Sequence, residues 1–69
     1  MAYLGESITI KRYAKERLYQ PAAGRYVTLL DLAQMIEDEE DFVVYEVPTG
    51  EDITRSILRQ IILERAKHG

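Results

Sequence analysis

Apolar and polar residues alternate near the start of the chain, where Ile8 and Ile10 are interleaved with polar residues that include Lys11 and Tyr13. A period of two is the pattern of a strand with one face buried and the other in water. The segment 7–13 is therefore predicted to be a half-exposed strand whose wet face carries Lys11 and Tyr13.

Two further short segments, 17–19 and 25–28, flank a loop that contains Pro21 and Gly24. Proline presets φ and glycine accepts positive φ, so this combination favours a tight or slightly bulged hairpin between two short strands. Such a hairpin would bring two arginines and two tyrosines close to one another: Arg17, Tyr19, Arg25 and Tyr26.

A helix is predicted to begin after Thr28 and to run over about 29–38. The Thr28 hydroxyl can accept a hydrogen bond from a free amide of the first turn, and Asp31 suits the positive end of the helix dipole. The apolar face of this helix comprises Leu29, Leu32, Ala33 and Ile36, widened by Leu30 and Met35.

The segment 42–47 is almost continuously apolar and β-branched, which predicts an interior strand covered on both faces. Pro48 and Gly50 predict a turn after it, and 51–54 can return as a short partner strand.

A last helix is predicted over about 55–67, and its apolar positions spread over about half of its circumference. That arc is wider than one packing contact usually needs, which favours a second partner. We therefore expect a homodimer or a higher homo-oligomer built on this helix. The expected interface residues are Ile57, Leu58, Ile61, Ile62 and Leu63.

Together these elements predict an α+β fold: a single small domain over residues 1–69 with short antiparallel strands, hairpins and two helices. A domain of this size buries only about 60% of the surface of its unfolded chain and is marginally stable. The sequence contains no cysteine and one histidine, so a disulfide or a zinc site is not expected to stabilise it. Small chains of this kind often gain burial by forming oligomers.

The charges are unevenly distributed along the sequence, although the net charge is −3. Residues 1–29 carry five basic residues against two acidic ones, residues 30–54 carry nine acids and no base, and residues 55–69 carry four bases against one acid. A polyanion would therefore meet the ends of the chain and avoid its middle. The acidic pI argues against nonspecific nucleic-acid binding by the whole surface but is compatible with one basic face.

Other function classes find little support in the sequence. There is no cysteine, no internal histidine and no glycine-rich phosphate loop, so we expect no enzyme activity, no metal site and no cofactor. No apolar run is long enough for a membrane span, and the first residues lack the charged and apolar regions of a signal peptide. A soluble cytoplasmic protein without membrane contact is expected.

Two charged groups on the predicted helices have more than one interpretation. Arg55 and Arg59 lie on one edge of the last helix, where they could grip a phosphate, line a dimer seam or pair with acids such as Glu51 and Asp52. The acidic run 37–41 follows the first helix. It is either a loop exit exposed to solvent or a contact for a basic patch of a partner, such as another protomer.

Several ordered segments of the chain together resemble a known family. They are Ile10-Lys-Arg-Tyr13, Arg17-Leu-Tyr19, Arg25-Tyr-Val-Thr-Leu29, Asp31-Leu32, Asp41-Phe-Val-Val44, Thr49-Gly-Glu-Asp-Ile-Thr-Arg-Ser-Ile-Leu58 and Gln60-Ile-Ile-Leu63. In these segments the chain resembles the N-terminal DNA-binding domain of the polyhydroxyalkanoate (PHB/PHA) accumulation regulators. The resemblance lies between residues 8 and 64 and so covers almost the whole chain.

The resemblance implies a bacterial transcriptional repressor domain that binds double-stranded promoter DNA of storage-granule genes, including those for granule-coating proteins and its own gene. It also implies release from DNA by the nascent polymer, and hence a polymer or granule surface as a further partner. The protein would be DNA- or granule-associated in the cytoplasm.

Cations and tyrosines between Ile10 and Tyr26 are the predicted DNA contacts, because cations bind phosphates and tyrosines offer hydroxyl donors and flat faces. The expected residues are Lys11, Arg12, Tyr13, Lys15, Arg17, Tyr19, Arg25 and Tyr26. Strict alternation places Arg12 on the Ile10 side of its strand. The alternative is a protein-interaction or oligomerisation module of the same fold without operator binding, which Glu16 and the net negative charge favour. The family usually has an arginine at the position of Glu16.

Overall fold

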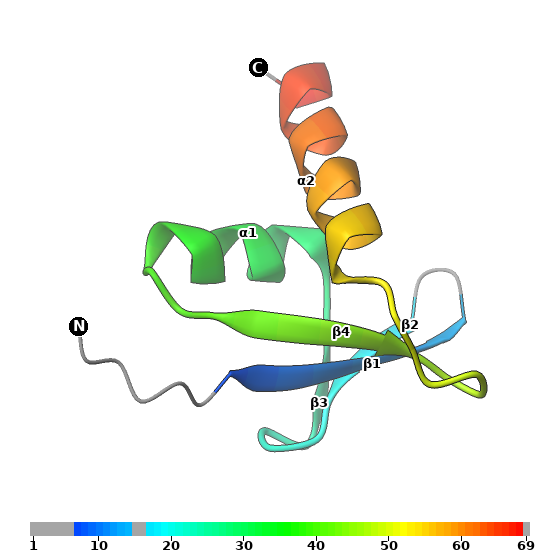
Figure 1. Ribbon diagram of the computed structural model, residues 1–69. Coiled ribbons are helices and arrows are strands. Elements are labelled where there is room, and N and C mark those ends of the chain that lie inside the picture. Colours follow the sequence, from blue (N-terminus) through cyan, green and yellow to red (C-terminus); the bar gives the residue numbers. More distant parts are fainter. Residues whose placement is uncertain (1–6, 15–16, 69) are drawn as a thin grey trace.

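The computed structural model describes residues 7–14 and 17–68, which form one sheet and two helices. In chain order the elements are β1 (Ile8–Ala14), β2 (Arg17–Gln20), β3 (Arg25–Val27), α1 (Leu29–Glu37), β4 (Phe42–Glu46), β5 (Glu51–Asp52) and α2 (Thr54–His68). The five strands lie in the order β3-β2-β1-β4-β5, and both helices lie on the same side of the sheet (Figure 1). The predicted α+β fold is confirmed.

The pairing of β1 with β4 is parallel, whereas the other neighbouring strands pair antiparallel. The prediction of antiparallel strands is therefore wrong for the β1–β4 pair. Parallel neighbours require a crossover connection, and here the β2–β3 hairpin followed by α1 returns the chain to the end of the sheet where β1 begins. The sheet is therefore mixed, with its two longest strands at the centre.

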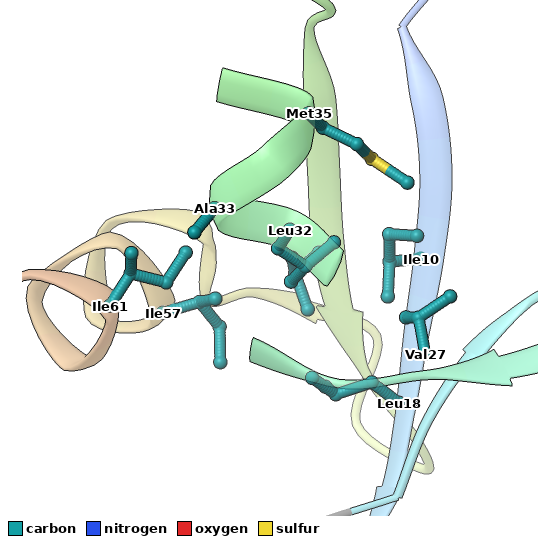
Figure 2. Packing of buried hydrophobic residues seen from close by; sticks show 9 residues of the cluster. Ile10, Leu18, Val27, Leu32, Ala33, Met35, Ile57 and Ile61 are labelled. Atoms are coloured by element: carbon teal, nitrogen blue, oxygen red, sulfur yellow. The ribbon is translucent and has the colours of Figure 1, made fainter. Parts of the chain in front are cut away.

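The core lies between the helices and one face of the sheet (Figure 2). On the sheet, Ile10 is the register partner of Val44, and Leu18 is the partner of Val27. The buried apolar residues are Ile10, Leu18, Val27, Leu32, Ala33, Met35, Val44, Ile57 and Ile61. No polar residue in the described part of the chain is buried.

The expectation that β4 is covered on both faces is wrong. Val44 is fully buried, but the next residue, Tyr45, is 37% exposed. Val44 belongs to the core cluster on the helix side, and among the residues that the structure describes no helix covers the opposite face of the sheet (Figure 1). The apolar run reflects the central position of β4 in the sheet rather than two covering layers.

The predicted start of α1 is confirmed by a complete capping box. The Asp31 N–H donates to Thr28 Oγ1 at 3.1 Å, and the Thr28 N–H donates to Asp31 Oδ2 at 2.9 Å. These bonds satisfy amides that have no partner within the helix. They fix the chain direction directly after β3.

The start of α2 is tied to the sheet through Thr54. The Val44 N–H donates to Thr54 Oγ1 at 2.8 Å, and the Thr54 N–H and hydroxyl donate to Asp52 Oδ1 at 3.0 and 2.7 Å. From this anchor α2 rises away from the sheet across α1 (Figure 1).

The arc of α2 that faces the core contains Ile57 and Ile61, which are 1% and 3% exposed. These two predicted interface residues are packed in the core of the domain itself and present almost no surface to a partner. Leu58, Ile62 and Leu63 are exposed. The sequence could not separate the two groups, because they form one continuous apolar arc.

Candidate nucleic-acid interface

The uncovered face of the sheet gathers most of the cations and tyrosines that the sequence singled out. Register partners in adjacent strands point to the same face of a sheet. Lys11 pairs with Tyr19 in β2 and with Tyr45 in β4, and Tyr19 pairs with Tyr26 in β3. We call this surface the open face; its members are Lys11, Tyr13, Arg17, Tyr19, Tyr26 and Tyr45.

Three tyrosines form a continuous row across β1, β2 and β3. The ring centroids of Tyr13 and Tyr19 are 6.3 Å apart, those of Tyr19 and Tyr26 are 5.0 Å apart, and both pairs meet edge to face. Tyr13 is 50% exposed and Tyr26 is 56% exposed, so both outer rings remain accessible. Edge-to-face contacts restrain the rings, which makes the row a partly preorganised surface.

Tyr13 lies at an irregularity in the pairing of β1 with β2. Arg12 is the partner of Leu18 and Ala14 is the partner of Arg17, so Tyr13 is the extra residue of a β-bulge. Bulges bend a strand and redirect side chains, and they are common beside functional sites. Here the bulge accompanies the placement of Tyr13 against Tyr19.

Two cations flank the tyrosine row. The Arg17 guanidinium carbon lies 5.8 Å from the centroid of the Tyr26 ring, which is cation–π distance. Lys11 is exposed next to Tyr19 in the register. Neither Lys11 nor Arg17 forms an ion pair with any residue that the structure describes. Within the described part of the chain, no carboxylate therefore competes with an external anion for these two charges.

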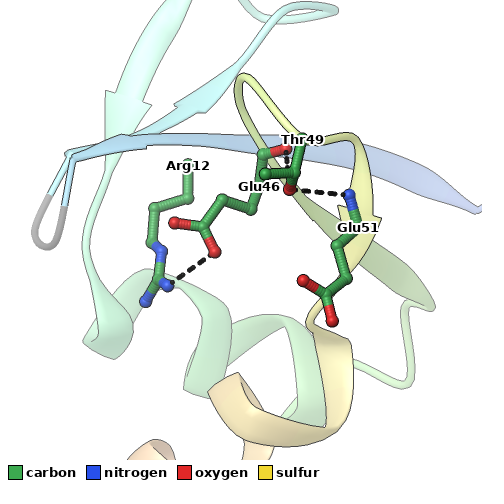
Figure 3. A network of polar contacts seen from close by, with 4 residues as sticks. All are labelled: Arg12, Glu46, Thr49 and Glu51. Atoms are coloured by element: carbon green, nitrogen blue, oxygen red, sulfur yellow. Dashed lines mark hydrogen bonds and ion pairs between the residues drawn. The ribbon is translucent and has the colours of Figure 1, made fainter.

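Arg12 is directed away from this surface. Its Nη2 donates to Glu46 Oε1 at 3.2 Å on the helix side of the sheet, and its side chain is only 19% exposed (Figure 3). Its Nε is buried without a hydrogen-bond partner in the described structure. Arg12 was the one predicted contact that the alternation of β1 placed on the Ile10 side, and the register agrees.

Arg25 also lies apart from the tyrosine row. It precedes Tyr26 in β3 and so points to the opposite face, where its Nη1 lies 4.0 Å from Asp31 Oδ2. Lys15 and Glu16 lie outside the described residues. Of the eight predicted DNA contacts, the structure brings together five: Lys11, Tyr13, Arg17, Tyr19 and Tyr26.

Sequence reasoning missed Tyr45 as a member of this surface. The signal was present in the alternation of β4, because Val44 is buried and Tyr45 follows it directly. The near-continuous apolar run from Phe42 to Val47 concealed that alternation.

Among the described residues, an acid borders the open face at its β5 edge. Asp52 in β5 is the register partner of Tyr45, at the end of the sheet farthest from β3. The hydrogen bond from the Thr54 hydroxyl, assisted by the Thr54 backbone N–H, lowers the pKa of Asp52 below its ordinary value of 3.8. Asp52 is therefore ionised at neutral pH, and an anionic ligand would be favoured toward the β1–β2–β3 end.

No cluster of three or more metal-ligating side chains occurs among the described residues. Within the same part of the chain, neither helix has the length and apolar character needed to cross a membrane.

A family model for the PHB/PHA accumulation regulator DNA-binding domain matches residues 9–69. The chain belongs to this family. The family is one of DNA-binding regulator domains and not of enzymes, so DNA is the partner that membership indicates.

Two curated relatives support the assignment. An uncharacterized protein in the phbA 5' region of Thiocystis violacea is 43% identical over 60 residues, which are 87% of this chain and 44% of that protein. An uncharacterized protein of Allochromatium vinosum is 42% identical over 60 residues, which are 87% of this chain and 39% of that protein. The accumulation-regulator domain thus spans less than half of these relatives. No solved structure matches it.

Proposed function

We propose that this domain binds double-stranded promoter DNA through the open face, with Lys11 and Arg17 on phosphates and the tyrosine row against the backbone or base edges. The observation that supports this most directly is the placement of Lys11 and Arg17 beside three linked tyrosines on the sheet face opposite the helices. Neither cation has an ion-pair partner among the described residues. Sheets and β-ribbons are known to read DNA grooves. Membership in a family of DNA-binding domains indicates that the partner is DNA.

The finer role follows from the family resemblance. The domain acts as the DNA-binding module of a bacterial cytoplasmic repressor of polyhydroxyalkanoate granule genes. The nascent polymer or the granule surface removes the repressor from its operator. The relative in the phbA 5' region supports a link to polyester genes.

The salt dependence of binding provides the first test. Each phosphate contact contributes about −0.9 to the slope of log K against log salt concentration on B-DNA. Lys11 and Arg17 together therefore predict a slope of about −2 per copy from the described residues. Fluorescence anisotropy with a labelled promoter duplex at several salt concentrations measures it.

The controls are a shuffled duplex and a single strand of the same sequence. Tighter binding to the promoter duplex than to both controls supports the proposal. Absence of salt-dependent binding at micromolar protein would contradict it and favour an interaction module that has lost operator binding.

A further inference from the structure

A depression on the helix side of the molecule lies between the end of α1, the start of β4 and the start of α2. Its volume is about 280 Å³, and it is lined by Ile36, Glu39, Glu40, Asp41, Phe42, Thr54 and Leu58. Apolar side chains form part of the lining, and three consecutive acids supply the rest of one side. This depression is separate from the open face, because the helices and the open face lie on opposite sides of the sheet.

Apolar surface continues from this depression along α2. Ile62 follows Leu58 by one helical turn, on the flank of α2 that Ile57 and Ile61 do not occupy. Ile62 is 66% exposed, and Leu58 and Ile36 are also exposed. The core of the domain leaves this stripe uncovered, as a docking surface would be.

The charges around the stripe are unpaired and have opposite signs. The three acids of the depression, Glu39, Glu40 and Asp41, form no ion pair within the described chain. Arg55 and Arg59, one turn apart on α2, likewise have no acidic partner there, so the alternative in which they pair with Glu51 or Asp52 is not seen among the described residues.

Both charge groups are also unfavourably placed for their own helices. Acids at the C-terminal end of α1 and Arg55 in the first turn of α2 each meet the like-signed end of a helix dipole. Glu39 has φ +61, a conformation at a helix end that glycine usually occupies. A partner that brings opposite charge to both places would offset the two unfavourable interactions with the helix dipoles.

The chain itself offers a partner of this chemistry. An apolar stripe flanked by arginines on α2 complements an apolar depression flanked by acids, and both surfaces are present on every copy. Reciprocal contacts between two identical patches are the requirement of a two-fold symmetric dimer. We propose that a second copy of this chain docks here, with α2 of each copy against the acidic depression of the other.

The test uses two charge-reversed variants, Glu39→Lys/Glu40→Lys and Arg55→Glu/Arg59→Glu. Each variant alone should dimerise at least about tenfold more weakly than the unmodified protein, since reversal sets like charges opposite each other. In an equimolar mixture, the lysines of one variant meet the glutamates of the other, and the second contact keeps its native charges. The mixture should therefore form a heterodimer.

Sedimentation and native mass spectrometry at tens of micromolar distinguish the 8.0 kDa chain from a species of twice that mass. Far-UV circular dichroism checks that both variants are folded, which is expected because the four side chains are exposed. Ile62→Ser should also weaken the dimer. Leu30→Ser is the matched control, because Leu30 is equally exposed but lines a different depression, and it should leave the dimer unchanged.

Three results would overturn the proposal: an unmodified protein that stays at 8.0 kDa, charge-reversed variants that dimerise normally, or folded variants whose mixture forms no heterodimer. Loss of the dimer in Leu30→Ser but not in Ile62→Ser would instead place the second copy at the other end of the α1–α2 contact.

Discussion

Arg12 and Arg17 provide a matched pair for the central proposal, because they lie five positions apart on paired strands and point to opposite faces of the sheet. Replacing each by alanine removes the same chemical group. The structure predicts opposite consequences for the two variants. Arg17→Ala should weaken DNA binding with little loss of stability, and Arg12→Ala should destabilise the domain with little direct effect on DNA binding.

The magnitudes follow from the contacts of each side chain. Arg17 is exposed and has a cation–π contact with Tyr26, whose loss costs about 0.5 kcal/mol, or about 2–4 °C in Tm for a domain of this size. Loss of one phosphate contact should reduce the salt slope by about 0.9 per copy. Arg12 is mostly buried, and its removal leaves the Glu46 carboxylate without its cation. That loss costs about 1–2 kcal/mol, or about 5–15 °C in Tm.

Thermal denaturation without DNA measures the first quantity, and anisotropy titrations across a salt series measure the second. DNA titrations of Arg12→Ala should be made well below its Tm, so that the folded fraction does not limit binding. Loss of DNA affinity in Arg12→Ala with an unchanged Tm would contradict the structural role of Arg12. An unchanged salt slope in Arg17→Ala would contradict the phosphate contact of Arg17.

Three further outcomes are expected. Leu32→Ala should lower the free energy of unfolding by about 2–5 kcal/mol, because removal of this fully buried side chain leaves a cavity. Chemical denaturation measures this free energy. Tyr26→Phe should reduce DNA affinity with an unchanged Tm, whereas Tyr26→Ala should also lower Tm through loss of the ring contact with Tyr19; equal Tm values for the two variants would argue against that contact. Because the pKa of Asp52 is lowered in the folded state, its ionised form stabilises the fold above pH 3.8, and this contribution is lost as the pH falls through the lower folded-state pKa. Asp52→Asn should therefore be less stable than the unmodified protein at pH 7. The difference in stability should shrink toward pH 2.

Local sequence patterns predicted every helix and strand, because the spacing of apolar residues indicates the type of element and capping or turn residues indicate where it begins or ends. Alternation identified β1, and the Thr28–Asp31 pair identified the start of α1. The parallel pairing of β1 with β4 could not be predicted in the same way, since periodicity shows which face of a strand is apolar but not which strand lies beside it. The helix arc of α2 likewise did not reveal which flank meets α1.

The site was predictable where alternation was applied strictly. It placed Lys11 and Tyr13 together and Arg12 on the other side, as the register shows. Applied to β3, the same rule separates Arg25 from Tyr26, although closeness along the hairpin suggested that they act together. The partner of Arg12 is Glu46, which is distant in sequence, and only the pairing of β1 with β4 brings the two side chains into contact.

Separation of charge by face explains how a domain with a net charge of −3 can offer a surface to DNA. The unpaired acids of the depression lie on the helix side, and the open face lies across the sheet from them. Charges in water are screened over about 8 Å at physiological ionic strength, so charges on opposite sides of the sheet are partly screened from each other. A phosphate at the open face therefore interacts mainly with Lys11 and Arg17 and only weakly with the acidic depression. The same acids remain free to select a partner of opposite charge, so the two surfaces can act independently in one small domain.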